Sequence, residues 1–416
     1  MPQPPARHSP ADPRQMAAAL VAAVVSDGRM LSDIALSPHA DPAERARAQR
    51  LALATLRNIG RADAVLSPHL RKPPPEAVMA ALRVAVVEML DLGAAPHGVV
   101  NAAVSALRAN KKTAPLTGMA NAVLRRASDF DGWSDLPVQR LPGWLRRRLK
   151  SGYGEETVQR IEAAHHAGAA IDLTLKPGAT SVPEGETLPG GSLRLPLGAQ
   201  VSAMPGFETG DWWVQDVAAA LPARLLAAQS GETVLDLCAA PGGKTMQLAA
   251  TGAQVTALDL SEARLQRVRE NLARTGLQAR VIRADALGWE PGTPFDAILL
   301  DAPCSATGTI RRHPDLPLIR KPADLEALVD LQARLLDRAV TLLKPGGRLV
   351  FCTCSLLPDE GEAQVAAMLA RTPGLHVAPL PAQPFGRATA EGGWRTLPGD
   401  LPGGVDGFYM ALLRRD

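Results

Sequence analysis

The chain has 416 residues, of which 46% are hydrophobic and 21% are charged. These proportions are ordinary for a soluble globular protein, and the length suits two or three domains that each bury a core. No apolar run in the sequence is long enough to cross a membrane, which excludes a membrane-spanning protein.

The net charge of +3 conceals an uneven distribution of charge along the chain. Residues 1–140 carry 17 Lys and Arg against 12 Asp and Glu. A basic cluster follows, made of Arg146, Arg147, Arg148 and Lys150. Such clusters are usually solvated helix faces, but one beside a catalytic domain is suited to holding phosphates.

The four cysteines, Cys238, Cys304, Cys352 and Cys354, include no Cys-x-x-Cys pair. This spacing gives no support for a zinc site, and a disulfide framework is not expected in a chain of this length. We therefore expect free thiols in a reducing compartment, and hence a cytoplasmic protein without a bound metal.

The front of the chain, residues 15–136, has the pattern of an all-α domain. Residues 1–14 contain five prolines and are expected to form a disordered tail. Within residues 76–92, apolar side chains recur every three or four positions, as on the buried side of a helix. The predicted helices are 17–26, 43–59, 76–92, 97–110 and 116–128. No acid–base or metal constellation occurs in them, which favours a binding module over a catalytic one.

Residues 137–205 are predicted to form a connector. The basic cluster lies on one predicted helix of this segment, and residues 155–167 predict a second helix. The remainder is rich in Gly and Pro and contains short alternating strands such as residues 192–195. We expect a small mixed subdomain here, in which His165 and His166 are surface residues rather than ligands.

From residue 206 to the end, segments of strand and helix character alternate. Residues 212–216 are predicted to open a helix that runs to residue 228. The predicted strands are 233–237, 254–259, 280–284, 296–300 and 348–353, and the helices between them are 243–251, 261–275 and 324–343. Such alternation predicts a Rossmann-like α/β domain, with a parallel sheet covered on both faces and ligands at the carboxyl ends of the strands.

Residues 234–245 are the most informative stretch of this α/β domain. A strand runs into a turn of small residues, 238–244, and a helix starts at once. Such a turn brings backbone N–H groups and the positive end of a helix up to a ligand. A P-loop would need glycine at position 238, where the chain has cysteine, and the G-x-G-x-x-G pattern of dinucleotide sites is also missing.

Polar groups follow each predicted strand. Asp259 closes the second strand, where a carboxylate accepts hydrogen bonds from ribose hydroxyls. An adenosine cofactor without a pyrophosphate fits both this carboxylate and the turn, which favours S-adenosylmethionine. The strand ends carry, in chain order, Asp236, Asp259, Asp285, Asp301 and Cys354. A lone Asp after a strand is often a helix cap, but four in register on one sheet edge favour a binding site.

Two cysteines, Cys304 and Cys354, follow neighbouring predicted strands and would lie close to a sulfonium cofactor. This arrangement favours covalent catalysis at sulfur, although a buried cysteine is often only a small apolar residue. Methylation of cytosine at C5 needs such a sulfur, because C5 becomes nucleophilic only after a group has added to C6. A partly ionised thiol performs this addition well. Loss of the C5 proton and cleavage of the bond to C6 must follow, which gives the second thiol a role.

Three phrases of the helical front, at residues 100–104, 111–112 and 118–126, are similar to the later helices of the NusB-like RNA-binding fold. Small-residue helices are common, so a generic helical bundle is the alternative.

Four longer motifs follow in the rest of the chain. They are Asp-Leu-Cys-Ala-Ala-Pro-Gly-Gly-Lys-Thr at 236–245, Asp-Ala-Pro-Cys-Ser-Ala-Thr-Gly at 301–308, Thr-Cys-Ser at 353–355 and Asp-Gly-Phe at 406–408. On these motifs, residues 206–416 resemble the Sun-type family of 5-methylcytosine RNA methyltransferases. With the NusB-like front, the chain from about residue 15 is similar to the bacterial branch that methylates one cytosine of 16S ribosomal RNA. The string Arg-Arg-His-Pro-Asp at 311–315 favours this branch.

The resemblance implies that Cys354 is the nucleophile that adds to C6 and that Cys304 helps to release the product. The implied contacts of S-adenosylmethionine are Cys238, Ala239, Ala240, Pro241, Gly242, Gly243, Lys244, Asp259, Asp285 and Asp301. The implied partner is 16S ribosomal RNA not yet assembled into the subunit, with no metal and no membrane involved.

The residues themselves suggest finer roles for the cofactor contacts. Asp259 suits the ribose hydroxyls, Asp285 the amino edge of adenine, and Asp301 the polar edge of the target base. Lys244 is able either to hold a carboxylate or to lower the pKa of a thiol.

Two departures from the family pattern and two alternatives stay open. Cys352 shares a strand face with Cys354, so the choice of nucleophile rests on the Thr-Cys-Ser frame. Gly361 stands where this family usually has Asn. The alternatives are the same reaction on transfer RNA and a non-catalytic RNA-binding factor, against which the helical front and the retained thiols argue respectively.

Overall fold

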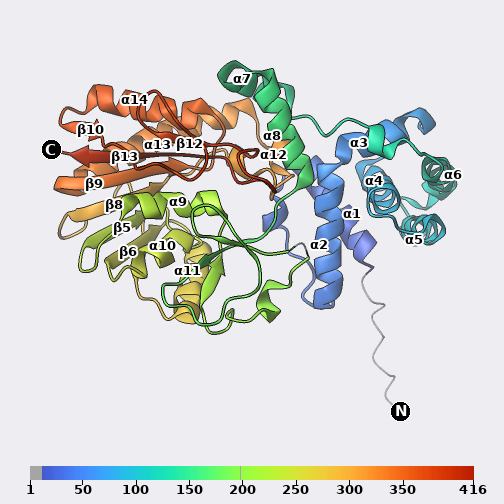
Figure 1. Ribbon diagram of the computed structural model, residues 1–416. Helices are drawn as coiled ribbons and strands as arrows, with labels where there is room; N and C mark the ends of the chain where they lie inside the picture. The colour runs from blue at the N-terminus through green and yellow to red at the C-terminus, as the bar shows by residue number, and fades with distance from the viewer. Residues whose placement is uncertain (1–11, 197) are drawn as a thin grey trace, which may run out of the picture. The chain divides into compact units, whose positions relative to one another are not determined.

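The computed structural model describes residues 12–416 except residue 197, and the chain divides into two compact units (Figure 1). They are a helical unit, made of the chain up to Arg146 with His313–Arg320, and an α/β unit, made of Arg147–Arg312 with Lys321–Asp416. Residues 1–11 of the predicted tail lie outside the described residues, and the first helix already begins at Pro13. The predicted domain limits at residues 136 and 205 stay predictions.

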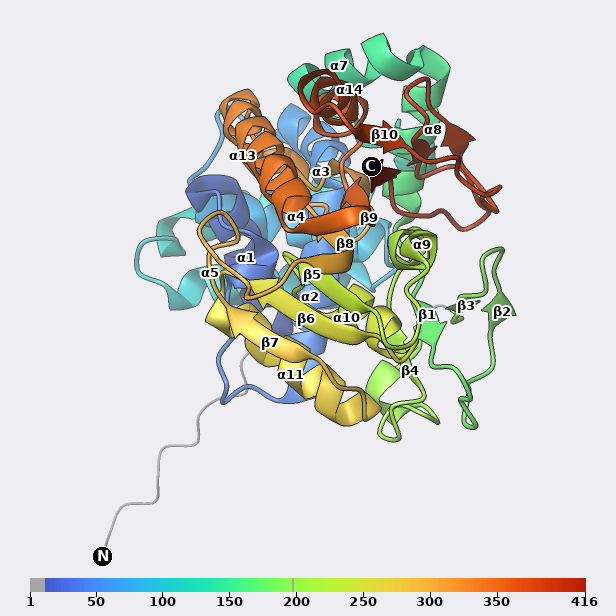
Figure 2. The same cartoon turned by 90° about the vertical axis from the view of Figure 1, so that its left-hand side faces the viewer.

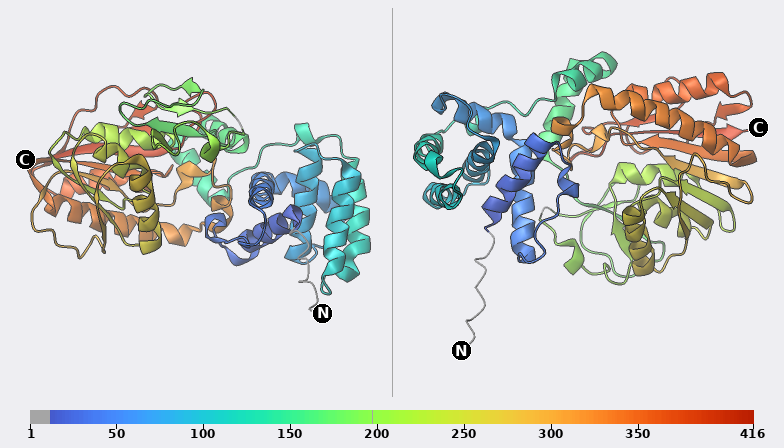
Figure 3. Two further views of the ribbon diagram at one scale, coloured as in Figure 1. Left: turned by 90° about the horizontal axis from the view of Figure 1, so that it is seen from below. Right: turned by 180° about the vertical axis from the view of Figure 1, so that it is seen from behind.

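The helical unit is organised around α4, Glu76–Leu90, which contacts α1, α2, α3, α5 and α6 (Figures 1 and 3). Eleven of its 15 residues are buried, because it carries apolar side chains on nearly all sides. The other helices of the unit are α1 (Pro13–Asp27), η1 (Leu31–Asp33), α2 (Pro42–Arg57), α3 (Ile59–Leu66), η2 (Ser67–His69), α5 (Pro96–Ala109), η3 (Ala114–Leu116), α6 (Thr117–Ser128), η4 (Trp133–Asp135) and α12 (Leu316–Ile319). The prediction of an all-α front is confirmed, and α3 is a helix that the sequence pattern missed.

The short segment His313–Arg320 packs into the helical unit although its neighbours in sequence belong to the α/β unit. Asp315 is fully buried, and its Oδ2 accepts a hydrogen bond of 2.8 Å from the backbone N–H of Leu31. Ile319 packs against the apolar core formed by α1, α2 and α4. The chain therefore leaves the α/β unit after Arg312, contributes α12 to the helical unit, and returns.

The α/β unit contains a sheet in the order β11-β12-β13-β9-β8-β5-β6-β7, with β10 paired to β13. Figure 2 shows β9, β8, β5, β6 and β7 side by side, and these five strands are parallel. The strands are β5 (Thr233–Leu237), β6 (Gln254–Asp259), β7 (Arg280–Arg283), β8 (Phe295–Asp301), β9 (Leu343–Thr353), β10 (Leu375–Val377), β11 (Arg387–Ala388), β12 (Trp394–Thr396) and β13 (Phe408–Arg415). The last, β13, runs antiparallel to β9.

Helices cover both faces of this sheet, as the sequence predicts for a Rossmann-like domain (Figure 2). Neighbouring residues of each strand point to opposite faces, so Leu299 packs with α9 and α10 whereas Leu300 packs with α13 and α14. The helices of the unit are α8 (Glu155–Ala167), η5 (Val201–Ala203), α9 (Val217–Leu226), α10 (Gly243–Ala249), α11 (Glu262–Thr275), η6 (Thr307–Thr309), α13 (Pro322–Thr341), η7 (Pro358–Glu360) and α14 (Glu362–Arg371), and α7 (Gly143–Tyr153) leads into it.

A small antiparallel sheet precedes the large one in sequence, and two predictions made for this part of the chain are wrong. Its strands are β1 (Asp172–Leu175), β2 (Glu186–Thr187), β3 (Leu193–Arg194) and β4 (Trp212–Val214), in the order β2-β3-β1-β4. The prediction that residues 212–216 open a helix is wrong, because β4 pairs with β1 and α9 starts only at Val217. His165 is 6% exposed, so it is not the surface residue that was predicted.

Candidate functional site

The polar strand ends meet where the parallel sheet changes its direction of growth. From β5 the chain moves outward through β6 to β7, and it then returns to β8 on the other side of β5. In such sheets, ligands bind in the crevice at the carboxyl ends of the two strands that flank this point. The turn that follows β5 and the last residue of β8, Asp301, therefore flank the expected binding crevice.

The turn after β5 has the strained backbone that close approach to a ligand requires. Cys238 has a φ of 62° and Gly242 a φ of 101°, both in the left-handed region. A Cβ at Gly242 would lie 3.3 Å from Val268 Cγ1, so glycine meets both the conformation and the limited space. From α11, Arg264 donates a hydrogen bond of 2.6 Å to the carbonyl oxygen of Ala240, which fixes the turn against that helix.

Asp259 and Asp285 lie at the ends of the next two strands in different environments. Asp259 is 3% exposed, and its Oδ2 accepts from the backbone N–H of Ala240 at 3.2 Å while its Oδ1 accepts from Ser261 at 3.0 Å. It therefore joins the turn after β5 to the end of β6. Asp285 is exposed and accepts from the backbone N–H of Leu287 at 3.0 Å, as a turn-capping carboxylate does.

Lys244 is buried, and its Nζ donates to Asp301 Oδ2 at 2.8 Å. Burial acts to lower the pKa of Lys244, but the attraction of Asp301 and of neighbouring acids outweighs it, so the pKa lies above its ordinary value. Both roles that the sequence left open for Lys244 stay predictions, since it pairs with Asp301 and its charge also acts to lower the pKa of Cys352. The pair sets a fixed positive and negative charge side by side at the end of β8.

The two thiols predicted to act in catalysis lie in contact. Cys304 Sγ and Cys354 Sγ are 3.4 Å apart, although 50 positions separate them in sequence. The hydrogen bond to Cys354, together with burial, raises the pKa of Cys304 well above its ordinary value. Cys304 therefore stays protonated near neutral pH, with its sulfur in contact with that of Cys354.

The other two cysteines occupy different environments. Cys352 is fully buried in β9, and its Sγ lies 3.6 Å from Asp301 Oδ1. Burial and the charge of Asp301 raise the pKa of Cys352 well above its ordinary value, so it stays a thiol. Burial, followed by the charge of Asp259, also raises the pKa of Cys238. Cys352 is buried and Cys238 is partly buried, and neither contacts the pair formed by Cys304 and Cys354 at hydrogen-bond distance among the described residues.

Within the described part of the chain, the buried Asp236 has a side-chain oxygen without a partner, which bears on whether the crevice suits an adenosine cofactor. Its Oδ2 accepts from Thr245 Oγ1 at 2.6 Å, whereas its Oδ1 has no partner among the residues that the structure describes. Burial raises the pKa of Asp236 to about 7. An orphaned acceptor beside a glycine turn fits a ligand that brings N–H or O–H donors, as an adenosine cofactor with an amino acid tail does.

Two groups of residues at this sheet edge were not found by sequence reasoning. Glu360 is buried between the loops that carry the two thiols. It accepts hydrogen bonds from Ser305 in one loop and from Ser355 in the other. Arg311 is also buried, and it donates to Asp216 at 2.9 Å and to Asp406 at 3.4 Å. The Arg-Arg-His-Pro-Asp string and the closing Asp-Gly-Phe motif were both noticed, but nothing in the sequence indicated that they bind each other.

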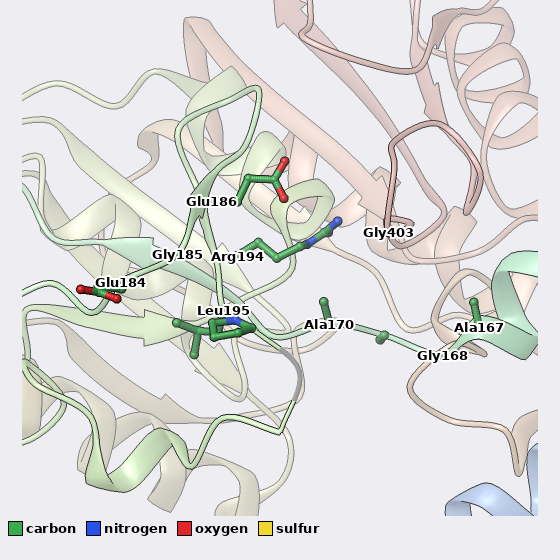
Figure 4. Close-up of a pocket in the computed structure, with 11 residues that line it drawn as sticks. Ala167, Gly168, Ala170, Glu184, Gly185, Glu186, Arg194, Leu195 and Gly403 are labelled. Carbon is green, nitrogen blue, oxygen red and sulfur yellow. The ribbon is translucent and has the colours of Figure 1, made fainter. Parts of the chain in front are cut away.

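A separate cavity of about 510 Å³ lies among the connector strands and is lined by Glu184, Glu186, Arg194 and Gly403 (Figure 4). Arg194 extends toward Gly403, and its guanidinium donates to Asp172 at 2.7 Å and to the carbonyl oxygen of Gly404 at 2.7 Å. Because partners within the chain already satisfy this cation, we assign no ligand to the cavity.

Within the described residues, no group of three or more His, Cys, Asp or Glu is placed to hold a metal ion. None of the described helices is long and apolar enough to cross a membrane.

A Rossmann-like sheet with acidic strand ends, a glycine turn and no pyrophosphate motif defines the class of α/β methyltransferases, here joined to a helical unit. Comparison with known proteins agrees with this class. Residues 223–414 match the family model described as 16S rRNA methyltransferase RsmB/F, and residues 11–129 match the NusB family. The solved structure of PH0851 superposes with a TM-score of 0.74 at 22% identity, covering 98% of this chain and 100% of that one, which shows a shared fold.

Curated relatives cover nearly the whole chain. A ribosomal RNA small subunit methyltransferase B from Xanthomonas campestris is 38% identical, and the match covers 96% of each chain. The protein of the same name from Vibrio cholerae is 37% identical over 97% of each chain. The chain therefore belongs to the ribosomal RNA small subunit methyltransferase B family, as its motifs predict.

Proposed function

We propose that this protein transfers a methyl group from S-adenosylmethionine to C5 of a specific cytosine in 16S ribosomal RNA, through a covalent bond between Cys354 and C6. Membership in the family supports the coarser statement, that the protein is a 16S rRNA methyltransferase. The observation that carries the finer one is the 3.4 Å contact between Cys304 Sγ and Cys354 Sγ at the sheet edge where a cofactor would bind.

The methyl donor is S-adenosylmethionine, in agreement with a methyltransferase family and a Rossmann-like fold. When bound, it supplies an electrophilic methyl group on a sulfonium. The residues assigned to hold it are the 238–244 turn, Asp259 for the ribose hydroxyls and Asp285 for the adenine edge. Asp236, with one orphaned oxygen, is available to accept from a donor of the cofactor.

The reaction begins with addition of the Cys354 thiolate to C6 of cytosine, which makes C5 nucleophilic. C5 then forms a bond to the methyl carbon as the bond between that carbon and the sulfonium sulfur breaks, with its electron pair left on sulfur as a neutral thioether. To release the product, the C5 proton leaves to a base and the electrons of that C–H bond restore the C5=C6 double bond as sulfur departs from C6. Cys304 assists this release from its position beside the Cys354 sulfur, and Asp301 orients the polar edge of the base.

The target base must leave any helix to reach these sulfurs, which favours an unpaired or flipped cytosine. We assign the binding of the surrounding phosphates to the helical unit and the basic cluster. Within that cluster, Arg148 pairs with Asp359 at 3.0 Å, whereas Arg147 is exposed to solvent. The exposed Lys111 and Lys112 add positive charge to the helical unit.

Covalent trapping tests the mechanism. In RNA that carries 5-fluorocytosine, the C5 fluorine cannot leave as a proton does, so the adduct persists and migrates as a protein–RNA species. Cys354→Ala should form no adduct, whereas Cys352→Ala should form it like the wild type. An adduct that survives in Cys354→Ala and disappears in Cys352→Ala would reassign the nucleophile.

Substrate choice is tested with purified RNA. Protein-free 16S ribosomal RNA, assembled small subunits and transfer RNA are each incubated with the enzyme and labelled methyl donor, and bisulfite sequencing locates the modified cytosine. We expect one site in free 16S ribosomal RNA and little label in the other two. Methylation of transfer RNA at a comparable rate would favour the alternative substrate.

The binding of RNA is tested with the full chain carrying Lys111→Glu and Lys112→Glu. These exposed changes should weaken RNA binding and reduce its dependence on salt while leaving cofactor binding intact. Unchanged RNA affinity would show that this surface does not contact RNA.

A further inference from the structure

Glu360 lies at the end of η7, between the loops that carry the two sulfurs, and its side chain is fully buried. Its Oε1 accepts from the backbone N–H of Ser305 at 2.8 Å and from Gln332 Nε2 at 3.0 Å. Its Oε2 accepts from the hydroxyls of Ser305 and Ser355, each at 2.5 Å. One carboxylate thus takes four hydrogen bonds from three elements of the α/β unit.

The two serines connect Glu360 to the thiols, because each serine directly follows one of the two cysteines in sequence. Ser305 follows Cys304 and Ser355 follows Cys354, and the serine hydroxyls lie 3.2 Å from each other. Each hydroxyl donates its single proton in a hydrogen bond to the Glu360 carboxylate, so both hydroxyls are held in fixed orientations. The carboxylate therefore fixes the backbones that carry the two sulfurs on either side of one point.

A merely structural role explains this geometry poorly. A buried carboxylate is costly unless donors surround it, and an apolar side chain usually fills such a space at lower cost. A neutral glutamine has only one acceptor oxygen and cannot take all four bonds. A single side chain that accepts hydrogen bonds from both thiol loops is suited to maintain the spacing between them.

We propose that Glu360 is a positioning residue that sets the distance between the Cys304 and Cys354 sulfurs, and thereby the rate at which the methylated product is released. This proposal rests on the proposed function, because it gives Cys304 its role in release. Misplacement of a reacting group by about 1 Å can cost about a hundredfold in rate. We call the four hydrogen bonds that Glu360 accepts the clamp. Loss of the clamp should therefore slow release of the product while leaving the substrate sites intact.

The first test compares Glu360→Gln with the wild type. The variant should lower kcat by about 10- to 100-fold and change KM for RNA and for S-adenosylmethionine less than about threefold, because the lost contact acts on the reacting sulfurs and not on binding. With ordinary cytosine RNA it should also accumulate a covalent protein–RNA adduct. Cys304→Ala is the positive control for such accumulation, since it removes the group that serves release.

The matched control is Asp296→Asn, which lies near the start of β8, whereas the thiols lie beyond the end of β8. Asp296 accepts from the backbone N–H of Thr233 at 2.9 Å, from its hydroxyl at 2.6 Å and from Lys344 Nζ at 2.7 Å. This carboxylate is also held by several donors but lies far along β8 from the thiols. Asp296→Asn should lower thermal stability and keep kcat within about twofold of the wild type.

Ser305→Ala and Ser355→Ala carry the test if Glu360→Gln does not fold. Each removes one hydroxyl from the clamp, and each should lower kcat and raise the adduct fraction. Wild-type kcat in both serine variants, or a Glu360→Gln variant with lower kcat but no adduct on ordinary RNA, overturns the proposal. If Cys354→Ala itself retains turnover, the proposed function fails, and that outcome is distinct from failure of the clamp.

Discussion

Replacement of Arg311 by methionine tests how strongly the loop that carries Cys304 depends on one buried charge. Arg311 is fully buried, and its guanidinium donates to Asp216 at 2.9 Å and to Asp406 at 3.4 Å. Removal of one partner from a buried ion pair leaves an uncompensated charge and costs about 3–5 kcal/mol. We therefore expect Arg311→Met to lower the free energy of unfolding at pH 8 by about 3–5 kcal/mol.

This loss should depend on pH, because Asp406 changes charge in the accessible range. Burial raises the pKa of Asp406 from 3.8 to about 6, against the opposing attraction of Arg312 and Arg311. The stability that this carboxyl contributes is fully present below its unfolded pKa and is lost as pH rises through its folded pKa. Without Arg311 the folded pKa rises further, so the variant loses more than the wild type at pH 8. At pH 5 the difference should shrink to about 1–2 kcal/mol, the value of the lost hydrogen bonds.

The assay is urea-induced unfolding at pH 5 and pH 8, followed by tryptophan fluorescence. Arg269→Met is the control, because Arg269 pairs with Glu262 on the surface and such pairs are worth about 0–1 kcal/mol. An Arg311→Met loss that is equal at both pH values, or no larger than that of the control, would refute the reasoning.

Three further changes test other parts of the site. Cys352→Ala should keep turnover within about fivefold, the equivalent of about 1 kcal/mol, because its sulfur contacts an acid rather than the other thiols. Gly308→Ala should lower the midpoint of thermal unfolding, since the added Cβ would lie 1.9 Å from the carbonyl oxygen of Gly407, whereas Gly288→Ala, with nothing within 4 Å, should not. Asp236→Asn should flatten the pH dependence of stability between pH 5 and pH 8, because the raised pKa of about 7 makes the wild type lose stability over that range; parallel curves would contradict this.

The parallel part of the sheet could be predicted from the sequence because its strands are short apolar runs that end in turns. The limits of β5 and β6 agree with the predicted strands 233–237 and 254–259. In contrast, β4 and β13 were missed, because an extended backbone there depends on pairing with distant strands. Val214 pairs with Leu173, about forty positions earlier, and local periodicity carries no information about such a partner.

The candidate site shows the same limit. Cys304 and Cys354 could be expected on one edge, because the ends of neighbouring parallel strands meet there, and their assigned roles stay predictions. The clamp at Glu360 could not be expected, since its four donors come from residues near 305, 332 and 355. Hydrogen bonds between loops depend on three-dimensional proximity that residue type and spacing do not encode.

The excursion of the chain through α12 changes how the two units can be separated or moved. Three peptide links join them, at Arg146, at Arg312 and at Arg320, so a single cut cannot detach the helical unit. A deletion of the first 146 residues would remove the apolar core against which Ile319 packs, and loss of activity would then not distinguish weaker RNA binding from a disturbed loop. The excursion begins at His313, nine positions after Cys304, so the loop that carries this thiol runs directly into the segment that packs in the helical unit.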